Sequence, residues 1–95
     1  MREIMADVHH ETVFFSGRVQ GVGFRYTALQ VAREYDVSGF AKNMSDGRVH
    51  LEVEGRADVV NAYITALEQR MHGYVRKTER TSQQRPPQFN GFSIG

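Results

Sequence analysis

The chain contains no cysteine. It therefore cannot form a disulfide, a thiolate nucleophile or a zinc site with cysteine ligands, and its chemistry is compatible with a reducing cytosol. It also has no excess of one charge, because 12 Lys and Arg residues are balanced by 11 Asp and Glu residues. A net charge of +1 gives no global field that would favour nucleic acid or a membrane surface. We expect neither as a partner.

Long apolar stretches are missing as well. Residues 1–10 (MREIMADVHH) lack the apolar core of a signal peptide, and no later stretch is long and apolar enough for a bilayer. We expect a soluble, cytoplasmic monomer with a loose lead-in over residues 1–10 and one domain over residues 11–95. His9 and His10 fall in this lead-in, where disorder is expected rather than a shared metal site.

The sequence does contain a run of glycines that ends in an arginine, since residues 17–25 read GRVQGVGFR. Glycine tolerates the positive φ angles that turn successive N–H groups toward one point. A helix beginning near Phe24 would add unpaired N–H groups and the positive end of its dipole. Arg25 adds a permanent charge with a forked donor set that matches a phosphate. The pattern predicts a phosphate-binding loop.

Patterns of β-branched, aromatic and alternating residues predict five strands. Residues 45–47 have the composition of a hairpin turn between the second and third strands. In the third strand, His50, Glu52 and Glu54 are expected on the outward, solvated side. The predicted strands are residues 12–19, 38–43, 48–54, 74–80 and 89–94.

Two further segments carry apolar residues at helical spacing, one from Phe24 to Tyr35 and one over residues 57–71. Asp36 is expected in the left-handed conformation that closes the first helix. The order is β-α-β-β-α-β with one additional short strand, which is that of a ferredoxin-like split βαβ fold. The sequence therefore predicts an α+β sandwich in which an antiparallel sheet carries two helices on one face.

This order brings two distant segments together. The helix after Arg25 carries the chain away by roughly 18 Å at 1.5 Å per residue. The strand over residues 38–43 brings it back by roughly 20 Å at 3.3 Å per residue. Asn43 should therefore lie beside the glycine loop, on the side of its strand that the helices cover. Arg25 should point back over the same loop, because helical side chains lean toward the N-terminus.

Two motifs resemble the signatures of the acylphosphatase family. The first, G-x-V-x-G-V-x-F-R, is matched within residues 17–25 at every fixed position. The second, a Gly-aromatic-small-basic-Asn run followed by spaced Gly, Val and Gly, is matched within residues 39–55. The resemblance extends from about Glu11 to Ile94. Asp36 and Tyr74 stand where the family commonly has glycine and proline, and neither position is part of the predicted site.

The resemblance implies metal-independent, cofactor-free hydrolysis of a small acyl phosphate to a carboxylate and inorganic phosphate. In this scheme the Asn43 carboxamide orients the attacking water, and the loop and the Arg25 guanidinium bind the phosphoryl group. The implied phosphate-binding residues are Gln20, Gly21, Val22, Gly23, Phe24 and Arg25. A carboxylate leaving group, with a pKa of about 4 to 5, departs as an anion at neutral pH and needs no acid catalyst.

Other classes of function were weighed against this one. The segment from Gly21 to Tyr26 lacks the third glycine of a dinucleotide fingerprint, and no P-loop Gly-Lys-Ser/Thr occurs. A non-catalytic domain that binds carbamoyl phosphate or phosphate remains an alternative. An RNA-binding module of the same topology is a weaker one, because Ser38 stands where its motif needs a basic residue.

Overall fold

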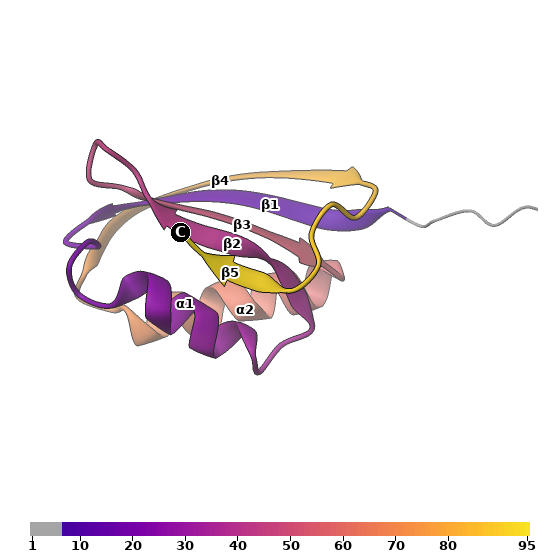
Figure 1. The fold of residues 1–95 in the computed structure, drawn as a ribbon, viewed down its shortest axis with the longest axis horizontal. Helices are drawn as coiled ribbons and strands as arrows, with labels where there is room; N and C mark the ends of the chain where they lie inside the picture. Colours follow the sequence, from indigo (N-terminus) through magenta and orange to yellow (C-terminus); the bar gives the residue numbers. More distant parts are fainter. Residues whose placement is uncertain (1–6) are drawn as a thin grey trace, which may run out of the picture.

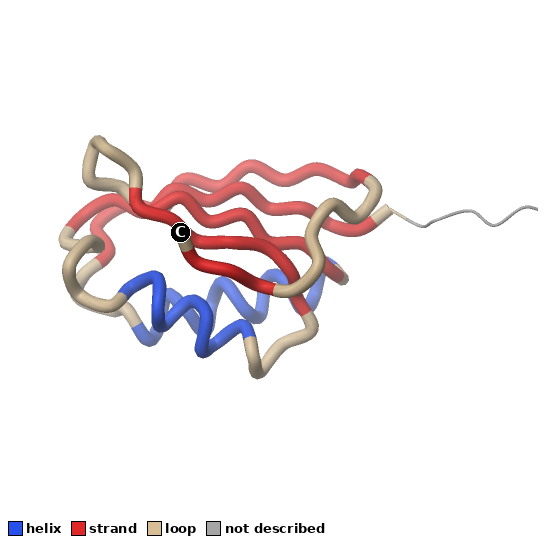
Figure 2. Tube along the Cα trace, viewed as in Figure 1, coloured by secondary structure: helices blue, strands red, loops and turns tan. Residues whose placement is uncertain are grey.

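The computed structural model describes residues 7–95, which form one sheet of five strands with two helices packed on one face (Figure 1). The elements are β1 (Val8–Gly17), α1 (Phe24–Ala32), β2 (Val37–Asn43), β3 (Val49–Gly55), α2 (Ala57–Arg70), β4 (Val75–Arg85) and β5 (Phe92–Ile94). The strands lie in the order β4-β1-β3-β2-β5. Figure 2 shows both helices on the same side of the sheet.

The ferredoxin-like α+β fold predicted from the sequence is confirmed. Strand β1 pairs antiparallel with both β3 and β4, and β2 pairs antiparallel with β3. The short strand β5 runs parallel to β2, from the Gly39–Phe92 pair to the Ala41–Ile94 pair, which makes the sheet mixed. The ends of β2 and β5 therefore lie at the same end of the sheet, where the C-terminal residues are found (Figure 1).

The core lies between the sheet and the helices. Its strand residues alternate inward as predicted, so that Val49, Leu51 and Val53 of β3 are fully buried. The helices contribute Phe24, Ala28, Val31 and Ala32 from α1 and Val60, Tyr63, Ile64 and Leu67 from α2. The Tyr63 hydroxyl donates to the Ala28 carbonyl oxygen (2.8 Å) and so joins the two helices. Burial raises the pKa of Tyr63 well above its usual range.

Strand β1 begins at Val8, inside the segment expected to be a loose lead-in. His9 and His10 belong to this strand, and the His10 side chain is buried between Glu52 and Phe89. The expectation that these two histidines are disordered is wrong, because β1 pairs with β3 and β4 over this length. Residues 1–6 of the predicted lead-in lie outside the described residues.

Three other local predictions are corrected. Asp36 is not in the left-handed conformation, since glycines alone have positive φ within residues 7–95. The outward-facing Glu54 is buried because its carboxylate accepts the N–H groups of Gln88 (2.8 Å) and Phe89 (2.9 Å) from the segment between β4 and β5. His50 is only partly exposed, since its ring stacks on Phe14.

Other element boundaries also differ from the sequence prediction, since β1 ends at Gly17 instead of Val19 and β5 begins at Phe92 instead of Phe89. Strand β4 extends to Arg85 instead of Arg80. Its polar Thr-Ser-Gln-Gln stretch has no apolar alternation, yet each residue pairs with β1. Main-chain hydrogen bonds to β1 hold these residues in a strand, although their composition alone does not predict one. Neither described helix is long and apolar enough to cross a membrane.

Candidate active site

A pocket of about 150 Å³ lies where the glycine loop after β1 meets the ends of β2 and β5. It brings together Arg25 and Asn43, which are 18 positions apart in the sequence. The described residues that line it are Val19, Gly21, Gly23, Phe24, Arg25, Tyr26, Asn43 and Ile94. Arg25 is the one charged side chain in this lining, so the pocket favours an anion.

The loop main chain is available to a ligand. Gly21 and Gly23 both have φ of 77°, the left-handed region in which glycine is favoured. Gly23 is the N-cap residue of α1, and no side chain caps the N–H groups of the first turn. Within residues 7–95, the main-chain N–H groups of residues 20–26 have no main-chain acceptor, and the first to have one is that of Thr27. Together with the helix dipole, these free donors make the loop suited to binding an anion.

The side chains of Gln20, Val22 and Phe24 hold the loop in place. The Gln20 amide donates to the carbonyl oxygens of Met44 (2.8 Å) and Arg48 (2.9 Å), which ties the loop to the β2–β3 hairpin. Val22 packs against the core, and Phe24 is buried against the ring of Phe15. Of the predicted phosphate-binding residues, these three therefore contribute main-chain groups to the loop and use their side chains as anchors.

Arg25 stands in the first turn of α1 and lines the pocket. Its guanidinium donates a hydrogen bond to the main-chain oxygen of Gly95. Gly95 is itself held by a hydrogen bond from its N–H to the Ala41 carbonyl oxygen (3.0 Å). The main-chain oxygen of Gly95 thus takes a position on the guanidinium that a phosphate oxygen could occupy.

Asn43 is the last residue of β2 and pairs with Val49 of β3. It is solvent-exposed, and its place in the pocket lining puts it on the same side of the sheet as the helices. The structure therefore places Asn43 beside the glycine loop, where the counting of helix and strand lengths expected it. Exposure leaves its carboxamide open to a water molecule.

Sequence reasoning missed three contributors to the pocket, namely Val19, Tyr26 and Ile94. Val19 is a fixed position of the glycine motif and Tyr26 follows it directly, and these positions were the available signal. Ile94 is brought in by the parallel pairing of β5 with β2, which no local pattern predicts. The same pairing brings Gly95 to Arg25.

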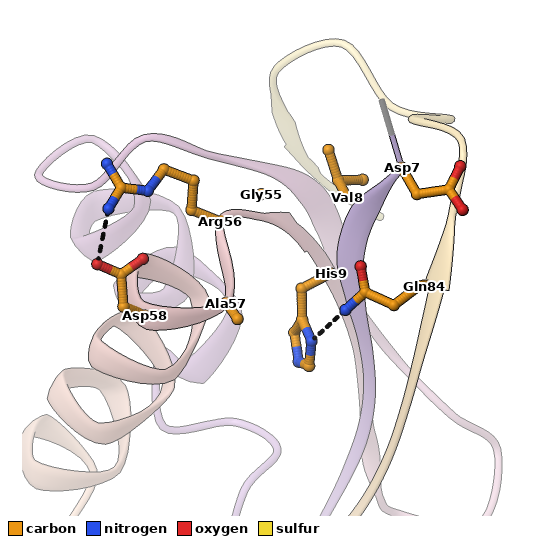
Figure 3. Close-up of a pocket in the computed structure, with 8 residues that line it drawn as sticks. All are labelled: Asp7, Val8, His9, Gly55, Arg56, Ala57, Asp58 and Gln84. Atoms are coloured by element: carbon orange, nitrogen blue, oxygen red, sulfur yellow. Dashed lines mark hydrogen bonds and ion pairs between the residues drawn. The ribbon is translucent and has the colours of Figure 1, made fainter. Parts of the chain in front are cut away.

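A larger hollow of about 480 Å³ lies at the opposite end of the sheet, beside the start of β1 and the N-terminus of α2 (Figure 3). Its polar side chains are largely paired, since Arg56 contacts Asp58 (3.0 Å) and His9 contacts Gln84 (3.3 Å). Its lining contains two carboxylates, and it includes none of the predicted phosphate-binding residues 20–25 and not Asn43. We therefore take the smaller pocket as the candidate active site.

The titratable groups with perturbed pKa values, Asp46, His50 and Tyr63, do not line this pocket. Hydrogen bonds from the Arg48 main chain and side chain lower the pKa of Asp46 in the hairpin turn. Burial lowers the pKa of His50, which faces the other side of the sheet. The pocket lining within residues 7–95 contains no histidine, aspartate or glutamate. The arrangement can bind an anion and position a water, and it offers no acid–base pair.

Comparison with known proteins identifies a family. The family model for acylphosphatase matches residues 11–94. An acylphosphatase of Ligilactobacillus salivarius is 32% identical over 79 residues, covering 82% of this chain and 88% of the relative. One from Roseiflexus sp. is 46% identical over 61 residues, covering 64% of this chain and 66% of the relative.

Solved structures show the same relationship. The crystal structure of acylphosphatase from Bacillus subtilis superposes with a TM-score of 0.84 at 30% identity, covering 92% of this chain and 98% of that one. Full-length HypF in a phosphate- and nucleotide-bound form has a TM-score of 0.79 at 24% identity, with 99% of this chain matching 12% of that one. The second likeness concerns the fold alone. The first, together with the family match over residues 11–94, confirms the expectation of an acylphosphatase-type hydrolase: the chain belongs to the acylphosphatase family.

Proposed function

We propose that this protein hydrolyses the carboxyl–phosphate bond of small acyl phosphates without a metal or cofactor. The observation that carries the proposal is the pocket in which Arg25, Asn43 and the unpaired N–H groups of the glycine loop meet. The pocket offers donors for a phosphoryl group and one carboxamide for a water. Membership of the acylphosphatase family supports the same reaction.

The reaction consists of one displacement at phosphorus. The loop N–H groups and the Arg25 guanidinium hold the phosphoryl oxygens, which displaces the Gly95 oxygen from Arg25. The Asn43 carboxamide orients a water, whose oxygen forms the new bond to phosphorus. The bond between phosphorus and the acyl oxygen breaks, and its electron pair leaves with the carboxylate. The proton lost by the water passes to the phosphate product or to solvent.

Catalysis here is a matter of positioning and electrostatics. Phosphoryl transfer passes through a loose transition state with negative charge on the equatorial oxygens, which fixed donors stabilise. A carboxylate leaves without protonation because its conjugate acid has a pKa of about 4 to 5. An ordinary phosphate ester leaves as an alkoxide and would require an acid. The lack of an acid–base pair in the described lining therefore favours acyl phosphates over esters.

The direct test is hydrolysis of acetyl phosphate by the purified protein in the presence of a metal chelator. We expect turnover that the chelator does not change, release of one phosphate per acetyl phosphate, and loss of turnover in Arg25→Ala. Arg33→Ala is the matched control, because Arg33 is an exposed arginine just after α1 and does not line the pocket. Phosphate binding without turnover would instead support a non-catalytic domain that binds carbamoyl phosphate or phosphate.

The RNA-binding alternative receives no support from the outer face of the sheet. Phe14 would have to offer its ring to a base, but its faces are taken by the His50 ring (4.6 Å between centroids) and the Arg48 guanidinium (4.5 Å). Phe40 lies edge-on against His50 and Phe89. Stacking of bases on aromatic rings is the main source of affinity in such modules.

A further inference from the structure

A groove of about 320 Å³ adjoins the candidate active-site pocket of about 150 Å³. Both hollows are lined by Ile94, the last residue of β5. The groove is otherwise lined by Phe40, Lys42, Phe89, Ser93 and Gly95. Pocket and groove therefore meet at the end of β5, which lies beside β2 in Figure 1.

Residues 94 and 95 form the wall between the two hollows. The Gly95 oxygen accepts the hydrogen bond from Arg25 in the pocket, while Gly95 also lines the groove next to Lys42. Lys42 and Asn43 are consecutive in β2, so their side chains point to opposite faces of the sheet. Asn43 consequently lines the pocket, and Lys42 lines the groove.

The groove combines apolar walls with an uncompensated positive charge. The Lys42 ammonium lies 5.7 Å from the centroid of the Phe40 ring, a cation–π distance. No ion pair among residues 7–95 involves Lys42, whereas the chain's other lysine, Lys77, lies 3.7 Å from Glu79. The charge complementary to this groove is therefore negative.

Glu52 lies on the same face of the sheet as Lys42 and could neutralise its charge, but its carboxylate already contacts other side chains. Glu52 contacts His10 (2.9 Å), His50 (3.0 Å) and Arg85 (3.7 Å). Lys42 pairs with His50 across the β2–β3 ladder, and its charge adds to burial in lowering the pKa of His50. Lys42 thus acts on its surroundings as an unbalanced cation.

We propose that this groove is the acyl subsite, and that it selects acyl phosphates whose acyl chain ends in a carboxylate. The inference rests on the proposed function, since it assumes that a phosphoryl group occupies the adjoining pocket. The chain of the acyl group lies along Phe40, Phe89 and Ile94, and its terminal carboxylate pairs with Lys42. Lys42 does not touch the reacting atoms and acts as a specificity-determining residue.

A matched pair of substrates tests the proposal. Adipoyl phosphate and hexanoyl phosphate have the same six-carbon chain and differ in the terminal carboxylate. An exposed ion pair of this kind corresponds to a preference of about threefold to fivefold in kcat/KM for adipoyl phosphate. The preference should lie in KM rather than kcat, because the contact is remote from phosphorus, and it should shrink as salt is added.

Three variants test whether Lys42 causes the preference for adipoyl phosphate. Lys42→Met should make the two substrates equivalent, and Lys42→Arg should keep the preference because it keeps the charge. Lys77→Met is the matched control, since it removes the other lysine from exposed β4 and should leave the preference intact. Equal kcat/KM for both substrates in the unmodified protein, or a preference that survives Lys42→Met, would overturn the acyl subsite.

Acetyl phosphate, whose acyl group is too short to reach Lys42, separates this inference from the proposed function. Its hydrolysis by the unmodified protein, combined with no Lys42-dependent preference for adipoyl phosphate, would overturn the subsite and leave the function standing. A protein that hydrolyses none of the three substrates would overturn both.

Discussion

At the scale of single residues, the candidate site depends on one guanidinium and one carboxamide. Arg25 is the charged member of the described pocket lining, and it already binds a main-chain oxygen, that of Gly95. Asn43 is exposed and lies at the end of a strand, where its position is fixed by pairing with Val49. Their tasks differ in the proposed mechanism, where Arg25 binds the phosphoryl group and Asn43 orients the water. Kinetics can separate the two roles.

Removal of the Arg25 side chain should lower kcat/KM for acetyl phosphate on the order of a thousandfold, because a charged clamp on the transferred group is lost. Arg25→Lys should recover little of this activity, since a point charge on a flexible stem cannot reproduce the planar fork. Steady-state kinetics of both variants check the expectation. Near-normal turnover by Arg25→Lys would count against a bidentate role.

Asn43→Ala should lower kcat by roughly a hundredfold or more while inorganic phosphate binds with similar affinity. The reason is that the carboxamide contacts the attacking water in the transition state, whereas it makes no contact with bound inorganic phosphate. Steady-state kinetics and phosphate titration by calorimetry give the two quantities separately. A large loss of phosphate affinity with kcat unchanged would reassign Asn43 to ground-state binding.

At the scale of elements, the site is a junction between the glycine loop and the β2–β3 hairpin. The link between them is the Gln20 amide, which bridges the carbonyl oxygens of Met44 and Arg48. The hairpin is in turn fixed by Asp46, whose carboxylate accepts the Arg48 N–H (3.1 Å) and the Arg48 Nε–H (2.9 Å). The loop conformation therefore depends on groups that do not line the pocket.

Gln20→Ala should weaken phosphate binding by several-fold and raise KM, because the loop loses both hydrogen bonds that hold it to the hairpin. Gln20→Glu should behave in the same way, since a carboxylate has no N–H to donate to the two carbonyl oxygens. Gln30→Ala on the exposed face of α1 is the control. Unchanged phosphate affinity in Gln20→Ala would show that the loop holds its shape without this bridge.

At the scale of the whole molecule, the two faces of the sheet respond differently to pH. The helix-covered face carries the pocket, whose described lining has no group that ordinarily titrates near neutrality. The opposite face carries His50, whose pKa is lowered chiefly by burial. Activity and stability should therefore follow separate pH profiles.

The rate prediction is that kcat for acetyl phosphate stays nearly flat between about pH 5 and 8, since the leaving carboxylate needs no general acid. A pH series of initial rates at saturating substrate measures this. A bell-shaped profile would instead report an essential acid and base and would contradict the mechanism.

The stability prediction follows from the lowered pKa of His50. The unfolded chain binds a proton at His50 near pH 6.5, whereas the folded protein does so at lower pH. The contribution of His50 to the free energy of unfolding is thus fully present above about pH 6.5. It is lost as the pH falls toward the pKa of His50 in the folded protein. The fall in Tm between pH 8 and pH 5 should be smaller in His50→Gln than in the unmodified protein.

His72→Gln is the control for this measurement, because His72 is exposed in the turn after α2. It should leave the pH dependence of Tm unchanged. If Tm falls by the same amount between pH 8 and pH 5 in His50→Gln and in the unmodified protein, another group on the outer face governs stability in acid.

Much of this protein was determined by its sequence. The alternation of Val49, Leu51 and Val53 and the helical spacing from Phe24 to Tyr35 predicted the elements, because burial of apolar surface imposes these periods. The glycines at 21 and 23 predicted the loop, since glycine is favoured at positive φ. The juxtaposition of Arg25 and Asn43 followed from the lengths of one helix and one strand, which have fixed rises per residue.

Only the tertiary structure decided the remaining features. The extension of β1 to Val8 and of β4 to Arg85 depends on hydrogen bonds between strands, which polar sequences can make as well as apolar ones. The burial of His10 and Glu54 depends on the segment before β5, which covers an outward-facing surface. The parallel pairing of β5 with β2 brings Ile94 and Gly95 to the pocket, about fifty residues from Asn43 in the sequence. Such contacts join residues far apart in the chain, and local periodicity carries no information about them.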